Sequence, residues 1–120
     1  MFKAMILLKR KSTATHEEFS QWWLQQHRLL AAKLPGLKRA VFNLADEECA
    51  VDYDGVSELW FESRADFEAA YASDIGKSVA ADSMDNVSAR ERLFVSEHVI
   101  FSPIFEWTND AKNQNTGRMD

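Results

Sequence analysis

The sequence predicts an α+β domain in which two helices pack on one face of a four-stranded antiparallel sheet. Segments with the apolar patterns of strands and helices follow one another in the order β-α-β-β-α-β. The first helical segment also carries a capping signature at its start and the pair Pro35-Gly36 at its end. With 120 residues, the chain has room for one such domain and one hydrophobic core.

The first two elements have the clearest patterns. Residues 2–9 form a short apolar run before the basic cluster Lys9-Arg10-Lys11, which predicts a strand covered on both faces. Thr15-His16-Glu17-Glu18 then has the form of a capping box, and no Gly or Pro follows until Pro35. This pattern predicts a helix from Thr15 through Lys33.

The remaining elements are predicted from alternation and caps. Two strands at Leu37–Leu44 and Val56–Glu62 are expected to pair, and Ser63 is the expected N-cap of a second helix. After a break near residues 73–76, we expect a short helical piece at Lys77–Asp82 and a last strand at Phe94–Phe101. The domain is expected to span residues 1–107, followed by a polar, mobile tail over residues 108–120.

The predicted arrangement leaves one face of the sheet without helices. The first strand is apolar on both sides, and exposing an apolar sheet face to water costs roughly 25 cal/mol per Å². A second copy of the chain is the simplest cover, so we expect a homodimer.

Composition excludes several classes of partner. The chain carries 19 acidic and 14 basic residues, for a net charge of -5, which argues against nucleic acid or an anionic membrane surface. A single cysteine, Cys49, and no export signal predict a cytoplasmic protein. The sequence has no glycine-rich phosphate loop and no clustered metal ligands, so no cofactor or metal is expected.

His27 is the first candidate for acid-base chemistry. It lies four residues after Trp23 and eight after Phe19, which turns its ring toward the sheet. Burial would lower the pKa of the imidazole and leave a neutral base. A core histidine bonded to a backbone carbonyl fits the same position, and position alone does not separate the two interpretations.

Other candidates lie on the predicted strands and loops. His98 alternates with apolar residues in the predicted last strand, where a buried or interface histidine is the alternative. Glu58 shares a strand face with Trp60, an unusual place for a carboxylate unless it lines a pocket or an interface, and Tyr53 precedes that strand. Aromatic residues more often pack in a core than bind a ligand, but the candidates for a pocket wall are Phe19, Trp23 and Trp60, together with Asn43.

Three blocks of the sequence resemble one family. Residues 23–37, with His27 eight residues before Pro35-Gly36, resemble the first-helix block of EthD-domain proteins. Residues 53–61 and 94–99 resemble the third-strand and final-strand blocks of the same family. The resemblance implies a ferredoxin-like fold that forms a dimeric α+β barrel. It also implies a site role for His27, because related isomerases of methyl-substituted muconolactones carry a histidine before the same turn, in a pocket between helices and sheet.

The activity implied by this resemblance is cofactor-independent chemistry on a small cyclic or aromatic molecule. The leading hypothesis is an isomerase or lyase of catabolism, with His27 as base and Tyr53, Glu58 or His98 assisting. One alternative is a cofactor-free monooxygenase of the same barrel superfamily. The other is a non-catalytic protein that binds a small apolar molecule for a partner enzyme.

Overall fold

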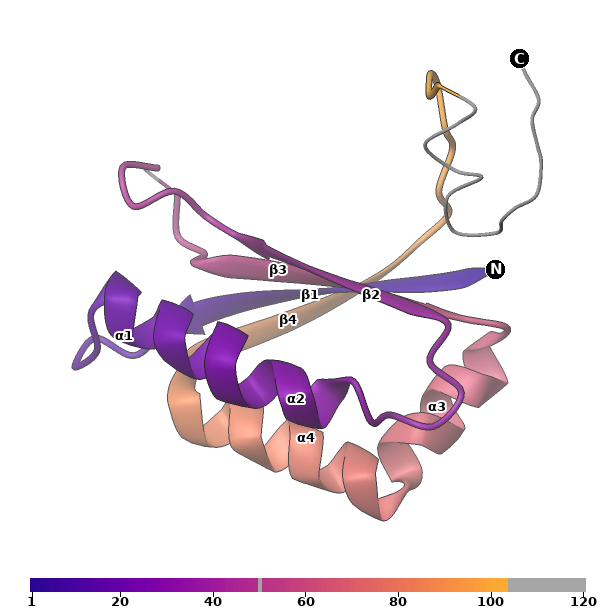
Figure 1. Cartoon of the computed structure of the whole chain (residues 1–120), viewed down its shortest axis with the longest axis horizontal. Coiled ribbons are helices and arrows are strands. Elements are labelled where there is room, and N and C mark those ends of the chain that lie inside the picture. The colour runs from indigo at the N-terminus through magenta and orange to yellow at the C-terminus, as the bar shows by residue number, and fades with distance from the viewer. Residues whose placement is uncertain (50, 104–120) are drawn as a thin grey trace.

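A computed structural model describes residues 1–49 and 51–103, so the predicted tail and the boundary at residue 107 lie outside the described residues. Figure 1 shows a twisted sheet with all the labelled helices on one side. The predicted order of elements is confirmed, with each helical region divided into shorter stretches. The elements are β1 (Phe2–Arg10), α1 (His16–Gln21), η1 (Trp22–His27), α2 (Arg28–Ala31), β2 (Arg39–Leu44), β3 (Gly55–Phe61), α3 (Arg64–Ala72), α4 (Asp74–Asn86) and β4 (Val87–Val95).

The sheet is antiparallel, with the strand order β2-β3-β1-β4. Side chains alternate between its two faces. Ala4, Ile6 and Leu8 of β1 are buried beneath the helices, whereas Lys3 and its alternate neighbours point to the opposite face. The pairing register therefore decides which residues can reach a site under the helices.

The first helix begins at the predicted capping box. The Thr15 hydroxyl accepts a hydrogen bond from the Glu18 amide at 3.0 Å, and the Glu18 carboxylate accepts one from the Thr15 amide at 2.8 Å. The helix then passes through a π-helical stretch, η1, before it returns to α-helix. Such wider turns are rare and often occur at functional sites.

The second helical region extends further than the sequence pattern predicts. Gly76 reads as a break, yet it lies inside α4, which runs to Asn86 and not only over residues 77–82. A Cβ at position 76 would lie 2.0 Å from the Ala70 carbonyl oxygen, so glycine is required by the close contact between α3 and α4. The Ser73 hydroxyl accepts a hydrogen bond from the Gly76 amide and caps the helix.

The last strand is the main error of the sequence prediction. β4 covers Val87–Val95 and pairs with β1 along its length, whereas the predicted strand was Phe94–Phe101. The alternating apolar residues after Phe94 gave the wrong boundary, and the charged residues Arg90, Glu91 and Arg92 hid the true strand. Long charged side chains can lie along a sheet with their aliphatic stems packed on apolar neighbours.

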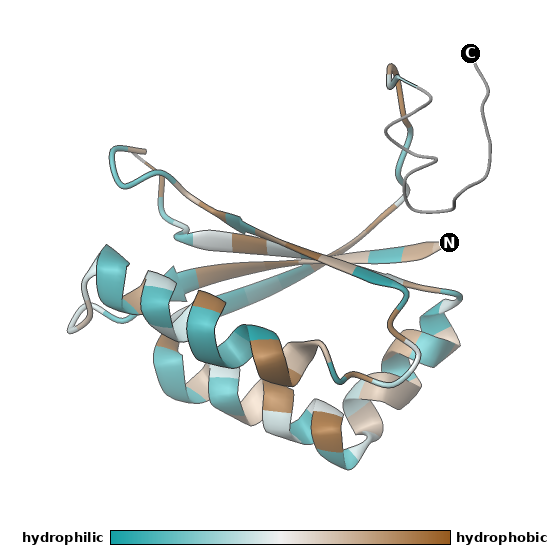
Figure 2. Cartoon of the chain, in the orientation of Figure 1, coloured by the Kyte–Doolittle hydropathy of each residue, from teal (hydrophilic) through white to brown (hydrophobic). Residues whose placement is uncertain are grey.

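The core lies between the helices and the sheet. Trp23, Phe61 and Phe67 are at most 2% exposed, and the Trp23 ring stacks on Phe42 with centroids 4.4 Å apart. Residues coloured brown for hydrophobic in Figure 2 occur along the strands. Gly55 makes room for Trp23, because an added Cβ would lie 2.5 Å from the indole ring.

No helix among the described residues is both long and apolar enough to cross a membrane.

Candidate functional site

The π-helical stretch places His27 beside Trp22. In an α-helix of 3.6 residues per turn, residues five apart lie about 140° apart around the axis. The wider turn of η1 brings the two rings together, with centroids 4.9 Å apart and planes tilted by 37°. His27 is 4% exposed, so the predicted inward direction of its ring is confirmed.

Asp82 of α4 fixes the tautomer of His27. The distance from Nδ1 of His27 to Oδ2 of Asp82 is 2.8 Å. An ionised carboxylate only accepts hydrogen bonds, so Nδ1 carries the proton and donates it. Nε2 is then unprotonated, and its lone pair accepts a hydrogen bond from the Ser83 hydroxyl at 3.4 Å.

Asp82 is itself held in place by two further donors. The indole nitrogen of Trp22 donates to Oδ2 of Asp82 at 3.2 Å, and the Asn86 side-chain amide donates to Oδ1 at 3.4 Å and to the Asp82 carbonyl at 2.9 Å. Helices η1 and α4 therefore share one hydrogen-bond network. Its effect is to hold the imidazole plane and direct Nε2 away from Asp82.

The protonation state of His27 follows from these contacts. Burial lowers the pKa of the imidazole, the hydrogen bond and charge of Asp82 raise it, and the Arg90 guanidinium lowers it. The net shift is downward from 6.5. His27 is therefore neutral at physiological pH and has an unprotonated Nε2, which is the state that a general base needs.

A small, partly enclosed cavity lies between the helices and the sheet at His27. It has about 10 Å³ of free space, which is room for about one water molecule. Most of its wall is apolar, from residues of β1, β2, β3 and the helices. The polar side chains that line it are those of His27, Ser57, Tyr71, Ser83 and Arg90.

Tyr71 and Arg90 form the polar wall of the cavity beside His27. Burial raises the pKa of the Tyr71 phenol, and the nearby Arg90 guanidinium, 5.9 Å from the ring centre, partly opposes this shift. Tyr71 therefore stays a protonated donor at neutral pH. Neither residue was predicted from the sequence, and neither were Asp82 and Ser83, because the predicted helix ended at Asp82 and the predicted last strand began after Arg90.

The structure brings together only part of the predicted site. Trp23 and Phe19 are buried in the core near His27, with their ring centroids 5.4 Å apart, but neither lines the cavity. Glu58 and Trp60 lie on the face of the sheet that points away from the helices, as Lys3 does, because they alternate with Ser57 and Leu59. Because side chains alternate between the two faces along β3, Glu58 and His27 lie on opposite sides of the sheet.

The predicted polar assistants belong to other networks. Glu58 binds Lys3 at 2.7 Å and Asn43 at 2.8 Å. Burial raises the pKa of Glu58, but the hydrogen bonds from Lys3 and Asn43 and the nearby positive charges lower it by more. The net shift of the pKa is downward, so the carboxylate stays ionised. The Tyr53 hydroxyl donates to the Glu91 carboxylate, likewise outside the cavity.

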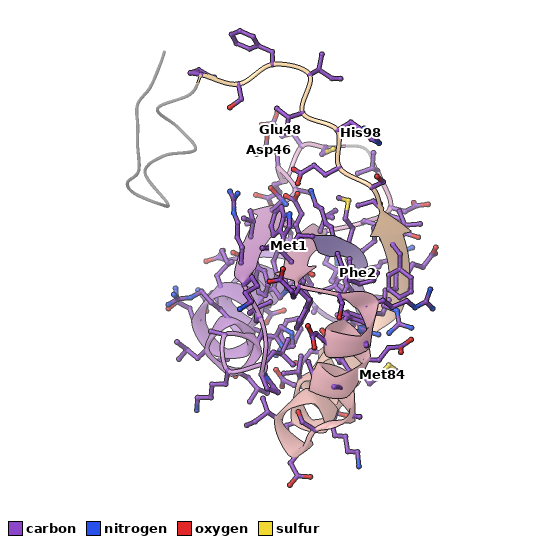
Figure 3. The ribbon with its side chains drawn as sticks, turned by 90° about the vertical axis from the view of Figure 1, so that its right-hand side faces the viewer. Met1, Phe2, Asp46, Glu48, Met84 and His98 are labelled. Atoms are coloured by element: carbon purple, nitrogen blue, oxygen red, sulfur yellow. The ribbon has the colours of Figure 1, made fainter. Side chains whose placement is uncertain are left out.

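His98 also lies apart from His27. It follows β4 in a segment without regular secondary structure and is exposed, with Nε2 3.2 Å from the Ser96 hydroxyl. Figure 3 shows His98 beyond the end of the sheet, on the side opposite Met84 of α4. The expected strand position of His98 is therefore corrected, and it does not contact the cavity.

The described part of the chain contains no group of three or more His, Cys, Asp or Glu side chains that could hold a metal ion. The polar groups at the cavity are one imidazole, one phenol, two hydroxyls and one guanidinium. This set can transfer a proton and bind an oxygen atom.

Comparison with known sequences identifies the family. The sequence model of the EthD domain matches residues 11–90, which is more than half of the chain. The chain belongs to the EthD family. The matched range includes His27, Asp82 and Arg90. None of the curated proteins compared with this EthD domain matches it.

Solved structures share the fold of this EthD domain. An EthD-family protein of Bacillus halodurans has a TM-score of 0.69 at 18% identity, over 82% of this chain and 100% of that one. A dimeric ferredoxin-like protein of unknown function from Thermobifida fusca has a TM-score of 0.67 at 17% identity, over 80% and 90% of the two chains. SnoaB of Streptomyces nogalater, described as a cofactor-independent oxygenase, has a TM-score of 0.62 at 13% identity, over 85% and 97%. The predicted α+β, ferredoxin-like fold is confirmed.

Proposed function

We propose that this EthD domain is a cofactor-independent enzyme that moves a proton on a small cyclic or aromatic molecule, as an isomerase or lyase does. One observation carries the proposal. His27 is buried and neutral, its Nδ1 donates to Asp82, and its unprotonated Nε2 lies at the edge of a mostly apolar cavity with only a long hydrogen bond, 3.4 Å, from Ser83. A general base has this arrangement when it removes a proton from carbon.

The proposed reaction needs no group beyond the residues of the cavity. Nε2 of His27 takes a proton from a carbon next to a carbonyl, and the electron pair of the broken C–H bond moves toward the carbonyl oxygen. The imidazolium, stabilised by Asp82, then returns the proton to another atom of the substrate in an isomerase. In a lyase the same proton leaves with a hydroxyl group as water. The cavity has room for about one water, so its lining must move to admit a ring.

Proton abstraction is tested directly by hydrogen exchange in D₂O. Small lactones, cyclic ketones and phenols are incubated with chelator-treated protein under nitrogen and under air, and carbon-bound deuterium is measured by NMR. We expect exchange or isomerisation of one class without oxygen, with a rate that rises with pH through the pKa of His27 and is level above neutrality. The rate rises with pH because only the neutral imidazole accepts a proton.

The two alternative functions give different results in the same assay. The structural likeness to SnoaB favours a cofactor-free oxygenase, which would consume oxygen with a phenol and show no turnover under nitrogen. The nearly closed cavity favours a binding protein, which would bind a compound with neither exchange nor oxygen uptake. Either result would reject the isomerase or lyase proposal.

We further propose that the helix-free face of the sheet forms a homodimer; the ferredoxin-like protein of Thermobifida fusca is described as dimeric. This face combines a buried Lys3, 7% exposed and paired with Glu58, with apolar neighbours. Packing two such faces against each other would remove those side chains from water. The apolar side chains are those of Met5, Leu7, Val41, Val56, Leu93 and Val95.

The dimer is tested by one substitution on this face. Leu93 is 52% exposed on β4, and Leu93→Glu would place a charge in the apolar contact. We expect the wild type to be a dimer at micromolar concentration by light scattering and the variant to be a monomer. Leu29→Glu is the matched control, because Leu29 is 55% exposed on the outer side of the helix layer and should leave the dimer intact. A monomeric wild type would reject the proposal.

A further inference from the structure

Arg90 has a buried hydrogen-bond donor that nothing in the structure uses. It lies on β4 opposite Leu8 of β1, so its side chain extends under the helices and lines the cavity. Its Nε atom is buried and has no hydrogen-bond partner among residues 1–49 and 51–103. Leaving a charged donor unpaired in a buried place is costly, so an acceptor that occupies this place would be bound favourably.

Among the described residues, the other buried side-chain nitrogen without a partner is Nε1 of Trp23. That indole is sealed in the core between Phe42 and Gly55 and does not line the cavity. Arg90 differs because it faces free space together with His27 and Tyr71. The unpaired nitrogen of Trp23 is therefore a cost of core packing, whereas the unpaired nitrogen of Arg90 can bind a ligand.

The charges around the cavity favour a negative ligand atom. Arg90 is the permanent cation in the wall, and the described residues place no carboxylate in the lining of the cavity. Asp82, the nearest acid in the network, is bound to Nδ1 on the opposite side of the imidazole ring. Tyr71 adds a phenol that stays protonated and can donate a second hydrogen bond.

We propose that Arg90 and Tyr71 bind the substrate oxygen that becomes negative when His27 removes the proton, which makes the substrate class a small carbonyl compound with an acidic C–H bond. The inference rests on the proposed proton transfer and specifies its substrate. The C–H bond breaks, its electron pair forms the C=C bond of an enolate, and the carbonyl π pair moves to oxygen. The proton goes to Nε2 of His27, and the negative oxygen is held by Nε of Arg90.

The test uses 4-nitrophenol, which resembles an enolate when ionised and absorbs differently as phenol and phenolate. Binding is measured by absorbance titration across pH, with nitrobenzene as the ligand without the oxygen. We expect the wild type to bind the phenolate at least about tenfold tighter than the neutral phenol, because a nearby positive charge typically shifts such an equilibrium by one unit or more. Arg90→Gln should lose this preference.

Arg92→Gln is the matched control for Arg90→Gln. Arg92 lies on the same face of β4, two residues further on, but it is exposed and lies over Phe67 and Phe94, 5.3 Å from each ring centre. This variant should keep the phenolate preference. Equal preference in Arg90→Gln and the wild type, or no binding of the phenolate to the wild type, would overturn the inference. A thermal melt of each variant shows that the protein is folded.

A His27→Gln variant separates this inference from the proposed function. If Arg90 holds the oxygen, His27→Gln keeps the phenolate preference although it removes the base. Phenolate preference in the wild type, without turnover of any carbonyl compound, would reject the proton transfer and retain the oxygen site. Turnover that is unchanged in Arg90→Gln would reject the oxygen site and retain the base.

Discussion

Replacing His27 with alanine is expected to lower kcat/KM by on the order of a hundredfold or more while the domain still folds. Loss of a general base typically costs this much, whereas loss of the buried hydrogen bond to Asp82 costs roughly 1–3 kcal/mol of unfolding free energy. The measurement is the initial rate on the compound found by the exchange assay, beside a thermal melt. His27→Gln gives a second variant that fills more of the space of the ring.

His98→Ala is the control for this prediction. His98 is exposed and, among the described residues, is bonded to the Ser96 hydroxyl alone, so its removal should leave the rate within about twofold of the wild type, because exposed substitutions rarely affect the fold. Equal losses of rate in the two alanine variants would contradict a role specific to His27. Normal turnover in folded His27→Ala would show that the imidazole is only a core residue.

Replacing Asp82 with asparagine is expected to lower the rate by roughly tenfold to a thousandfold, because the tautomer of His27 is no longer fixed. The carboxylate accepts from both Nδ1 of His27 and the Trp22 indole, and an amide that turns its NH₂ toward Nδ1 would force the proton onto Nε2. Removing the charge of Asp82 also removes a cause that raises the pKa of His27. The acidic limb of the pH-rate profile should therefore move to lower pH.

Two measurements check the role of Asp82. NMR of the ¹⁵N-labelled imidazole reports which nitrogen carries the proton, and it should change from Nδ1 in the wild type toward Nε2 in Asp82→Asn. Asp85→Asn is the matched control, because Asp85 is exposed on the same helix, three residues further on. If the rate and the tautomer are unchanged in Asp82→Asn, Asp82 does not position the base.

The sequence predicted the framework because its signals are local. The capping box at Thr15, the cap at Ser63 and the short apolar run of β1 depend on residues a few positions apart, and the structure has the two caps and a strand at these places. The errors have non-local causes. Gly76 looks like a helix break until α3 is packed against it, and β4 looks too charged for a strand until β1 pairs with it.

Of the residues at the candidate site, His27 was predicted from the sequence, but the polar residues around it were not. The helical phase pointed His27 inward, and this direction depends little on the π-helical turn. Asp82 and Arg90 lie 55 and 63 positions after His27 in the chain, on elements whose bounds were predicted wrongly. Glu58 and Tyr53 were predicted as polar residues in or near a strand, but the pleat of β3 points Glu58 to the helix-free face, and Tyr53, in the loop before β3, bonds Glu91 instead.

The two hydrogen-bond partners of the His27 ring are consecutive residues, Asp82 and Ser83, on a helix that also forms a wall of the cavity. A displacement of α4 that widens the cavity would thus pull both partners from the imidazole at once. Entry of a ligand and assembly of the base are then coupled through one rigid element. The base is assembled while α4 packs in this position, and after a ligand has entered it would be assembled again once α4 has returned, which protects an unstable intermediate from solvent.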